Sequence, residues 1–170
     1  MILKNFQKFY FYKLLVRFNE LVELKSQKKL TFKSPTGSGK TIMMAEFINQ
    51  LSKKKSKSNN LCFVWTAPRK LHQQSKDKLA KYLGNASQVD LSYFNDLKEK
   101  KINRNEILFL NWESINKKNK NTIILENENE FYLNKIIENT LEDGLDIILI
   151  IDESHFNAPS TISKSLISDI

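Results

Sequence analysis

Apolar and polar residues alternate in blocks along this chain, and the blocks predict strands and helices in turn. Residues 29–33 (Lys-Leu-Thr-Phe-Lys) alternate polar with apolar side chains, as a short strand does. Residues 61–66 predict a further strand, and residues 145–151 form a nearly unbroken apolar run, the pattern of a central parallel strand covered on both faces. After Thr41, apolar residues recur at helical spacing up to Lys53, which predicts a helix there.

The other blocks continue this alternation. The further elements expected are helices at about 3–25, 69–83 and 131–141, a short strand near Val89, and strands at 107–110 and 123–125. Such an order predicts an α/β fold with a mainly parallel sheet and helices on both faces. At 170 residues, the chain is expected to form one domain with no internal boundary.

A glycine-rich turn follows the strand expected at 29–33, and it reads Ser-Pro-Thr-Gly-Ser-Gly-Lys-Thr. Its two glycines let the backbone curl so that N–H groups face an anion. Lys40 then reaches the β- and γ-phosphates, and the Thr41 hydroxyl is placed to bind Mg²⁺. The alternative is an ordinary Ser/Gly turn before a helix; the preceding strand and following helix favour a phosphate-binding loop. The residues expected to bind nucleotide are Pro35, Thr36, Gly37, Ser38, Gly39, Lys40 and Thr41.

An acidic pair, Asp152 and Glu153, follows the apolar run 145–151, at the strand end where open α/β sheets place their ligands. Asp152 is expected to hold Mg²⁺ together with Thr41, and Glu153 to orient or polarise the attacking water. Alone, such a strand end is more often a loop with solvated acids; together with Lys40 it favours a nucleoside triphosphate site. This prediction requires the Lys40 ammonium and the Asp152 carboxylate to converge on one pocket.

Composition bears on the partner of the chain and on its cellular location. The net charge of +8 favours an anionic partner without identifying it, because the lysine-rich stretches 53–60 and 116–121 are equally typical of solvated loops. The one cysteine, Cys62, lies in an expected strand, which indicates a buried, inert thiol and a reducing, cytoplasmic location. No apolar run reaches the roughly 18 residues of a membrane span, and the first residues lack the features of a secretion signal.

Four segments resemble motifs of the first RecA-like motor domain of superfamily 2 helicases and translocases, in the branch with Asp-Glu-x-His boxes. Residues 34–41 resemble motif I, with Ser in place of the usual first Gly. Trp65–Leu71 resembles motif Ia, and Asp152–His155 resembles motif II. Leu3–Gln7 is similar to the family's Leu-Arg-x-Tyr-Gln sequence, with Lys and Phe where the family has Arg and Tyr.

The resemblance implies a RecA-like P-loop NTPase domain that uses ATP and Mg²⁺. It implies that Gln7 reads the adenine edge and that His155 couples the acidic box to a neighbouring domain. It also implies that Pro68, Arg69 and Lys70 contact the sugar-phosphate backbone of a nucleic acid. There Arg69 would form a charge-assisted hydrogen bond that positions the strand without reading its sequence. Alternatively, Pro68 and Arg69 merely start a helix, and His155 is structural.

Residues 109–116 (Phe-Leu-Asn-Trp-Glu-Ser-Ile-Asn) and 152–157 look most like the Res subunit of type III restriction–modification enzymes. In that family the motor consumes ATP to survey DNA, and a separate nuclease domain cuts. The resemblance implies double-stranded DNA and a modification methyltransferase subunit as partners. Within the chain, Trp112 either stacks on a base or packs in the core. The alternative functions are another DEAD/DEAH-like DNA or RNA helicase, and a non-catalytic nucleotide-binding half-motor that scaffolds other subunits.

The family continues after motif II with motif III and a second RecA-like domain that carries arginine fingers. Residues 1–170 end before either, so they are expected to be the N-terminal part of the first RecA-like domain, truncated before motif III. The second motor domain and any nuclease domain would then be absent. Because an arginine finger contributes about 10³–10⁵ in rate, the isolated chain is expected to bind nucleotide weakly and to hydrolyse it poorly.

Overall fold

The chain divides into two compact units. The computed structural model describes residues 3–24, 29–53, 60–85, 87–111 and 133–153. One unit, here called the loop unit, consists of Met1–Lys54 and Asp77–Gln88. The other, the sheet unit, consists of Lys55–Lys76 and Val89–Ile170.

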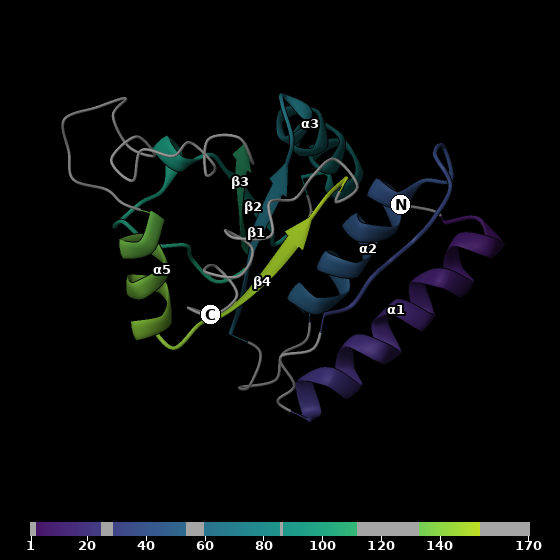
Figure 1. Cartoon of the computed structure of the whole chain (residues 1–170), viewed down its shortest axis with the longest axis horizontal. Helices are drawn as coiled ribbons and strands as arrows, with labels where there is room; N and C mark the ends of the chain where they lie inside the picture. The colour runs from purple at the N-terminus through teal and green to yellow at the C-terminus, as the bar shows by residue number, and fades with distance from the viewer. Residues whose placement is uncertain (1–2, 25–28, 54–59, 86, 112–132, 154–170) are drawn as a thin grey trace. The chain divides into compact units, whose positions relative to one another are not determined.

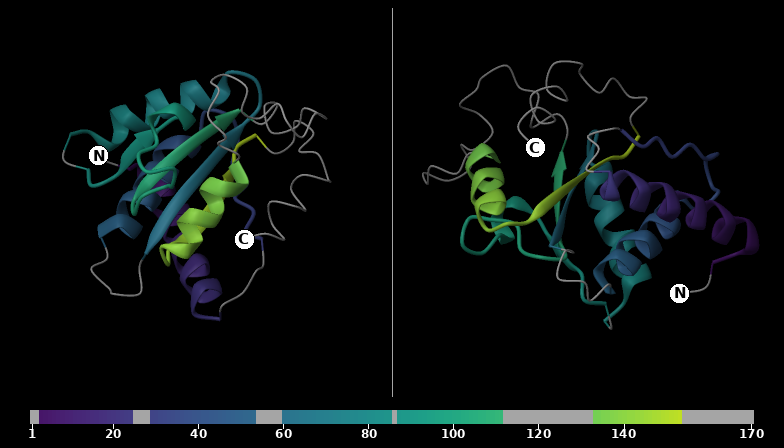
Figure 2. Two further views of the ribbon diagram at one scale, coloured as in Figure 1. Left: turned by 90° about the vertical axis from the view of Figure 1, so that its left-hand side faces the viewer. Right: turned by 90° about the horizontal axis from the view of Figure 1, so that it is seen from below.

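Two helices form most of the loop unit. Helix α1 spans Asn5–Glu23 and helix α2 spans Lys40–Lys53, and they lie side by side (Figures 1 and 2). The rings of Phe18 and Phe47 meet edge to face between them, with centroids 5.2 Å apart. The start of α1 is capped by Gln7, whose Oε1 accepts a hydrogen bond of 2.9 Å from the Lys4 backbone N–H. The helices expected over these residues are confirmed.

A four-stranded parallel sheet forms the centre of the sheet unit (Figure 1). Its strands, in the spatial order β2-β3-β1-β4, are β2 Asp90–Ser92, β3 Glu106–Asn111, β1 Leu61–Ala67 and β4 Asp146–Ile151. The other elements are α5 Leu133–Glu142, the 3₁₀ turn η1 Phe94–Asp96, and α3 Leu71–Leu83, which ends in the loop unit. In the register, Phe63 of β1 lies opposite Ile107 of β3 and Ile148 of β4. The predicted α/β fold with a parallel sheet is therefore confirmed.

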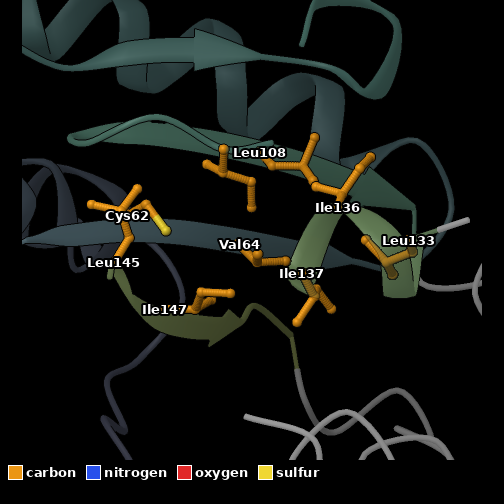
Figure 3. Packing of buried hydrophobic residues seen from close by; sticks show 9 residues of the cluster. Cys62, Val64, Leu108, Leu133, Ile136, Ile137, Leu145 and Ile147 are labelled. Carbon is orange, nitrogen blue, oxygen red and sulfur yellow. The ribbon is translucent and has the colours of Figure 1, made fainter. Parts of the chain in front are cut away.

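The central strand β1 is buried along its whole length. Its alternate residues Cys62 and Val64 belong to an apolar cluster that α5 covers from one side (Figures 2 and 3). The side chains of this cluster come from β1, β3, β4, α5 and the segments that join them: Cys62, Val64, Ile102, Leu108, Leu133, Ile136, Ile137, Leu145 and Ile147. The intervening residues Phe63 and Trp65 are also buried. Burial on both faces explains why the strand reads as a continuous apolar run.

Cys62 has the buried, inert thiol that the sequence predicts. Its side chain is 0% exposed, and it is a free cysteine. Burial raises the pKa of the Cys62 thiol to about 12, and the nearby Glu106 and Asp146 carboxylates add to the rise. The thiolate, the reactive form, is therefore suppressed at neutral pH.

The strand predicted at residues 29–33 is wrong. These residues form no strand and pair with no strand among the described residues. Only Phe32 is half-buried in this segment, while Thr31 and Lys33 are exposed. Leu30 remains 39% exposed, so the segment buries little apolar surface to support strand pairing.

The remaining predicted elements are either confirmed or lie outside the described residues. The short strand near Val89 is confirmed as β2, and the predicted helices are confirmed as α3 and, from Leu133 onwards, as α5. The strand predicted at 123–125 and the lysine-rich stretch 116–121 lie outside the described residues. In the part of the chain that the structure describes, every helix is too short or too polar to cross a membrane.

Candidate functional site

The phosphate loop of residues 34–41 lies in the loop unit and leads into α2. Gly37 and Gly39 have φ angles of +79° and +89°, in the left-handed region that glycine adopts at little cost. Ser38 tightens the turn, because its backbone N–H and its Oγ both donate to the Pro35 carbonyl, at 3.2 and 2.7 Å. The two glycines therefore have the curled backbone that the sequence pattern predicts.

Ser34 occupies the position where the usual pattern has glycine. It has no positive φ, so the backbone does not require glycine here. Its hydroxyl shares a hydrogen bond of 2.5 Å with the Ser38 hydroxyl, and its carbonyl accepts one of 3.4 Å from Lys40 Nζ. The serine thus adds a hydrogen bond that glycine lacks, and the Lys40 side chain folds back across the loop.

Gln7 of α1 contacts the same loop. Its Nε2 donates to the Ser38 carbonyl at 2.9 Å, and the residue is only 7% exposed. The approach is close: a Cβ atom at Gly39 would lie 2.3 Å from Gln7 Nε2. Two segments that the sequence connects only by resemblance, the start of α1 and the phosphate loop, are therefore in direct contact.

Helix α2 begins at Lys40, directly after the glycines, and its first backbone hydrogen bond runs from Met43 N–H to the Gly39 carbonyl at 3.1 Å. The N–H groups in the first turn of a helix point out of its start, where the helix dipole is also positive. This end of α2 therefore suits a phosphate group. Thr41 is half-buried in that first turn.

The acidic pair lies in the sheet unit, immediately after β4. The Asp152 backbone N–H donates to the Thr66 carbonyl at 2.9 Å, which holds the turn against β1. Asp152 Oδ2 accepts a hydrogen bond of 3.1 Å from the Ser75 hydroxyl of α3. Within the described residues, Asp152 Oδ1 accepts no hydrogen bond, so one carboxylate oxygen is left for a metal or water. Glu153 has φ +53°, a left-handed conformation that is uncommon for a residue other than glycine.

The donor set fits Mg²⁺. The Thr41 hydroxyl and the Asp152 carboxylate supply oxygen, which Mg²⁺ prefers, and this ion usually takes one or two protein ligands and completes its shell with phosphate and water. The described residues contain no group of three or more His, Cys, Asp and Glu side chains that could hold a metal by themselves. Because Lys40 lies in the loop unit and Asp152 in the sheet unit, their convergence on one pocket stays a prediction.

The segment predicted to hold nucleic acid connects β1 to α3. Pro68 is buried, whereas Arg69 and Lys70 are exposed. Arg69 has φ +53°, and the Leu71 N–H donates to the Pro68 carbonyl at 3.1 Å as α3 begins. The segment is therefore a turn before a helix, and it presents two cations at the carboxyl end of β1.

Sequence reasoning missed a cluster at the same edge of the sheet. Lys76 Nζ lies 3.6 Å from the centroid of the Tyr93 ring and 3.4 Å from Asp96 Oδ2. The His72 ring meets the Tyr93 ring edge to face at 6.2 Å. Tyr93 N–H donates to Asp96 Oδ2 at 2.8 Å, and this bond, followed by Lys76, lowers the pKa of Asp96. Tyr93 follows β2 as Pro68 follows β1, but no sequence pattern pairs a lysine of α3 with it.

Two residues singled out in the sequence, Trp112 and His155, lie outside the described residues, so their roles stay predictions. Of the two residues that bond Asp152, Ser75 was not singled out in the sequence, and Thr66 was named only as part of the segment that resembles motif Ia. A serine within a helix and a threonine within an apolar strand carry no signal of such a partner until the fold is known.

The parallel sheet with its flanking helices defines a RecA-like α/β domain, and the glycine loop and the acidic pair are the parts expected of the P-loop type. The family model for the type III restriction enzyme, res subunit, matches residues 1–167, and the chain belongs to this family. The resemblance drawn from the motifs is thereby confirmed, and the domain is of the superfamily 2, helicase-like ATPase motor type. Searches among the curated proteins and among the solved structures found no match.

Proposed function

We propose that this chain is the nucleotide-binding part of an ATP-dependent DNA translocase, within the first RecA-like domain of a type III restriction Res subunit. The observation that carries the proposal is the geometry of the phosphate loop. Two left-handed glycines curl it, Ser38 closes it, and Lys40 crosses it at the start of a helix. Family membership over nearly the whole chain supports the same conclusion.

In this proposal, Lys40 and the loop N–H groups hold the β- and γ-phosphates of ATP. The Thr41 hydroxyl and Asp152 hold Mg²⁺, which when bound neutralises charge on the phosphates. Gln7 positions the adenine edge: its amide has two N–H donors, and among the described residues one of them is used, on the Ser38 carbonyl. Pro35, Thr36 and Gly37 shape the loop around the phosphates.

Glu153 is the proposed residue that orients the attacking water and accepts its proton. Its position supports this role, because it follows Asp152 directly at the carboxyl end of β4. Its left-handed backbone is costly for a glutamate, and such conformations concentrate at functional sites. A second RecA-like domain would supply the arginine finger, as the resemblance implies.

Pro68, Arg69 and Lys70 form the proposed nucleic-acid contact. Buried Pro68 fixes the turn, and the two exposed cations bind phosphates without reading sequence. The net charge of +8 adds long-range attraction for an anionic polymer. Double-stranded DNA is the proposed substrate, and a modification methyltransferase subunit is the proposed partner.

ATP turnover by the full-length protein, with and without nucleic acid, tests the proposal. Double-stranded DNA should stimulate turnover, and changing both Arg69 and Lys70 to alanine should remove the stimulation and reduce the salt slope of DNA binding by about 2. Lys78→Ala, which removes an exposed cation of α3, is the control and should leave both unchanged. Turnover indifferent to nucleic acid would contradict the proposal. Stimulation by RNA alone would indicate another helicase, and nucleotide binding without turnover a scaffold.

A further inference from the structure

The Ser75 hydroxyl makes an unusual hydrogen bond for a serine within a helix. Such serines commonly bond the carbonyl one turn earlier, as Ser52 does to the Ile48 carbonyl at 2.8 Å in α2. Ser75 instead donates to Asp152 Oδ2, 77 residues away, at 3.1 Å. Both serines are 6% exposed, so burial does not explain the difference. The Ser75 hydroxyl is directed at a carboxylate of the proposed metal site.

Asp152 is also bonded to Thr66, which precedes the turn between β1 and α3, whereas Ser75 follows that turn. Its backbone N–H donates to the carbonyl of Thr66, which is fully buried near the end of β1. The two residues that bond Asp152, Thr66 and Ser75, therefore flank the segment 67–74. That segment contains Arg69 and Lys70, the proposed contacts to nucleic acid. Asp152 is thus bonded at both ends of the turn that would bind DNA, to Thr66 through its backbone N–H and to Ser75 through its carboxylate.

We infer that Ser75 is a positioning residue for Asp152 and links the proposed nucleic-acid contact to the proposed metal site. This inference rests on the proposed function. With Oδ2 held by Ser75, rotation of the carboxylate is restricted, and Oδ1 stays directed to the metal shell. When a phosphate backbone pulls on Arg69, the turn moves α3 and Ser75, and the orientation of the Asp152 carboxylate changes with them.

Thermodynamic linkage makes this arrangement measurable. If bound DNA changes the affinity for the Mg²⁺–nucleotide complex by some factor, the nucleotide changes the affinity for DNA by the same factor. Such factors are commonly about 5–150. If the coupling between DNA and the Mg²⁺–nucleotide complex runs through the Ser75 hydroxyl, removing this oxygen should reduce the coupling factor. Nucleotide binding without Mg²⁺ should stay unchanged.

The test measures the affinity of the full-length protein for ADP with a fluorescent ribose label, across a Mg²⁺ titration, with and without a double-stranded oligonucleotide. Ser75→Ala should raise the Mg²⁺ concentration for half-maximal binding by about tenfold, as expected for a lost charge-assisted hydrogen bond, and bring the DNA-dependent factor close to one. Ser75→Thr keeps the hydroxyl and should restore both. Ser52→Ala, matched in burial, should alter only the melting temperature.

The outcomes separate a failure of the Ser75 inference from a failure of the proposed function. If Ser75→Ala keeps the wild-type Mg²⁺ dependence and DNA factor, the inference is overturned while the proposed function stands. If the wild-type protein shows no Mg²⁺-dependent nucleotide binding, the proposed function fails and the inference with it. Where Ser75→Ala does not fold, Ser75→Cys provides a weaker donor of similar size; a folded Ser75→Cys protein with wild-type coupling also overturns the inference.

Discussion

The phosphate loop and the acidic turn after β4 are held in shape by different kinds of contact. In the loop, Ser34, Ser38 and Lys40 bond to one another or to Pro35, so almost every tie lies within a few residues. The acidic turn instead depends on Thr66 and Ser75, which are distant in sequence. Local bonding makes a loop that one short motif specifies, whereas the acidic turn exists only once β1, β4 and α3 are assembled.

The phosphate loop and the acidic turn also differ in which residues carry their left-handed backbone conformations. The loop places its left-handed φ angles on glycines, Gly37 and Gly39, where they cost little. The acidic turn places one on Glu153, where a left-handed conformation costs about 1–2 kcal/mol. The acidic turn therefore carries strain at a residue whose side chain is proposed to be catalytic, and the phosphate loop avoids it.

The largest expected effect comes from Glu153→Gln. It keeps the size of the side chain but removes the proton acceptor, so ATP turnover of the full-length protein should fall by about 10²–10⁴. Nucleotide affinity should not change, because the phosphate loop is untouched. Steady-state hydrolysis and labelled-nucleotide binding measure the two effects.

Glu142→Gln is the matched control for this change, since Glu142 is exposed at the end of α5. It removes the same charge and should leave turnover intact. Unimpaired hydrolysis by Glu153→Gln would show that the acidic turn does not activate water.

The next largest effect separates two glycines of the loop. In Gly39→Ala, the alanine would have to keep a left-handed backbone. Its Cβ would also lie 2.3 Å from Gln7 Nε2 and 2.9 Å from Ile42 Cγ2. In Gly37→Ala only the backbone is unfavourable, because no atom lies within 4 Å of the new Cβ. We expect a cost of about 1–2 kcal/mol for Gly37→Ala and about 1–3 kcal/mol more for Gly39→Ala.

Melting temperatures check this order, at about 2–4 °C per kcal/mol for a chain of this size. Gly84→Ala serves as the control away from the loop, since Gly84 also has a positive φ, +65°, and open space around it. It should cost about as much as Gly37→Ala without changing nucleotide affinity. Equal costs for Gly37→Ala and Gly39→Ala would mean that the contact between α1 and the loop is not tight.

The same contrast explains how far the sequence could predict this structure. The loop and the presence of strand β4 were predictable because their signals, glycine spacing and a nearly unbroken apolar run, lie within a few residues. The central position predicted for that strand is wrong, because β4 lies at the edge of the four described strands and is mostly half-buried. The strand expected at 29–33 failed because alternation alone does not supply a pairing partner. The bond from Ser75 to Asp152 and the stacking of Lys76 on Tyr93 join elements far apart in sequence, so no local pattern could reveal them.

A moderate effect is expected at Gln7, where α1 and the loop meet. Gln7→Glu keeps the oxygen that accepts from Lys4 N–H but replaces the Nε2 that donates to the Ser38 carbonyl. We expect a loss of about 1 kcal/mol in stability and a weaker preference for ATP over GTP. Competition binding with the two nucleotides measures that preference. Gln73→Glu, an exposed change on α3, is the control; an unaltered preference in Gln7→Glu would exclude Gln7 as the adenine contact.

The smallest effect concerns Asp96, whose pKa is lowered below its usual value of 3.8, first by the Tyr93 N–H and then by Lys76. A lowered pKa in the folded state means that the charged carboxylate stabilises the protein above pH 3.8, and that this stabilisation is lost as the pH falls further. Asp96→Asn should therefore lower the urea midpoint slightly at pH 6, and the difference from wild type should shrink towards pH 3. Asp77→Asn, an exposed change on α3, should show no such convergence. A difference that stays constant with pH would mean that Asp96 acts through its shape rather than its charge.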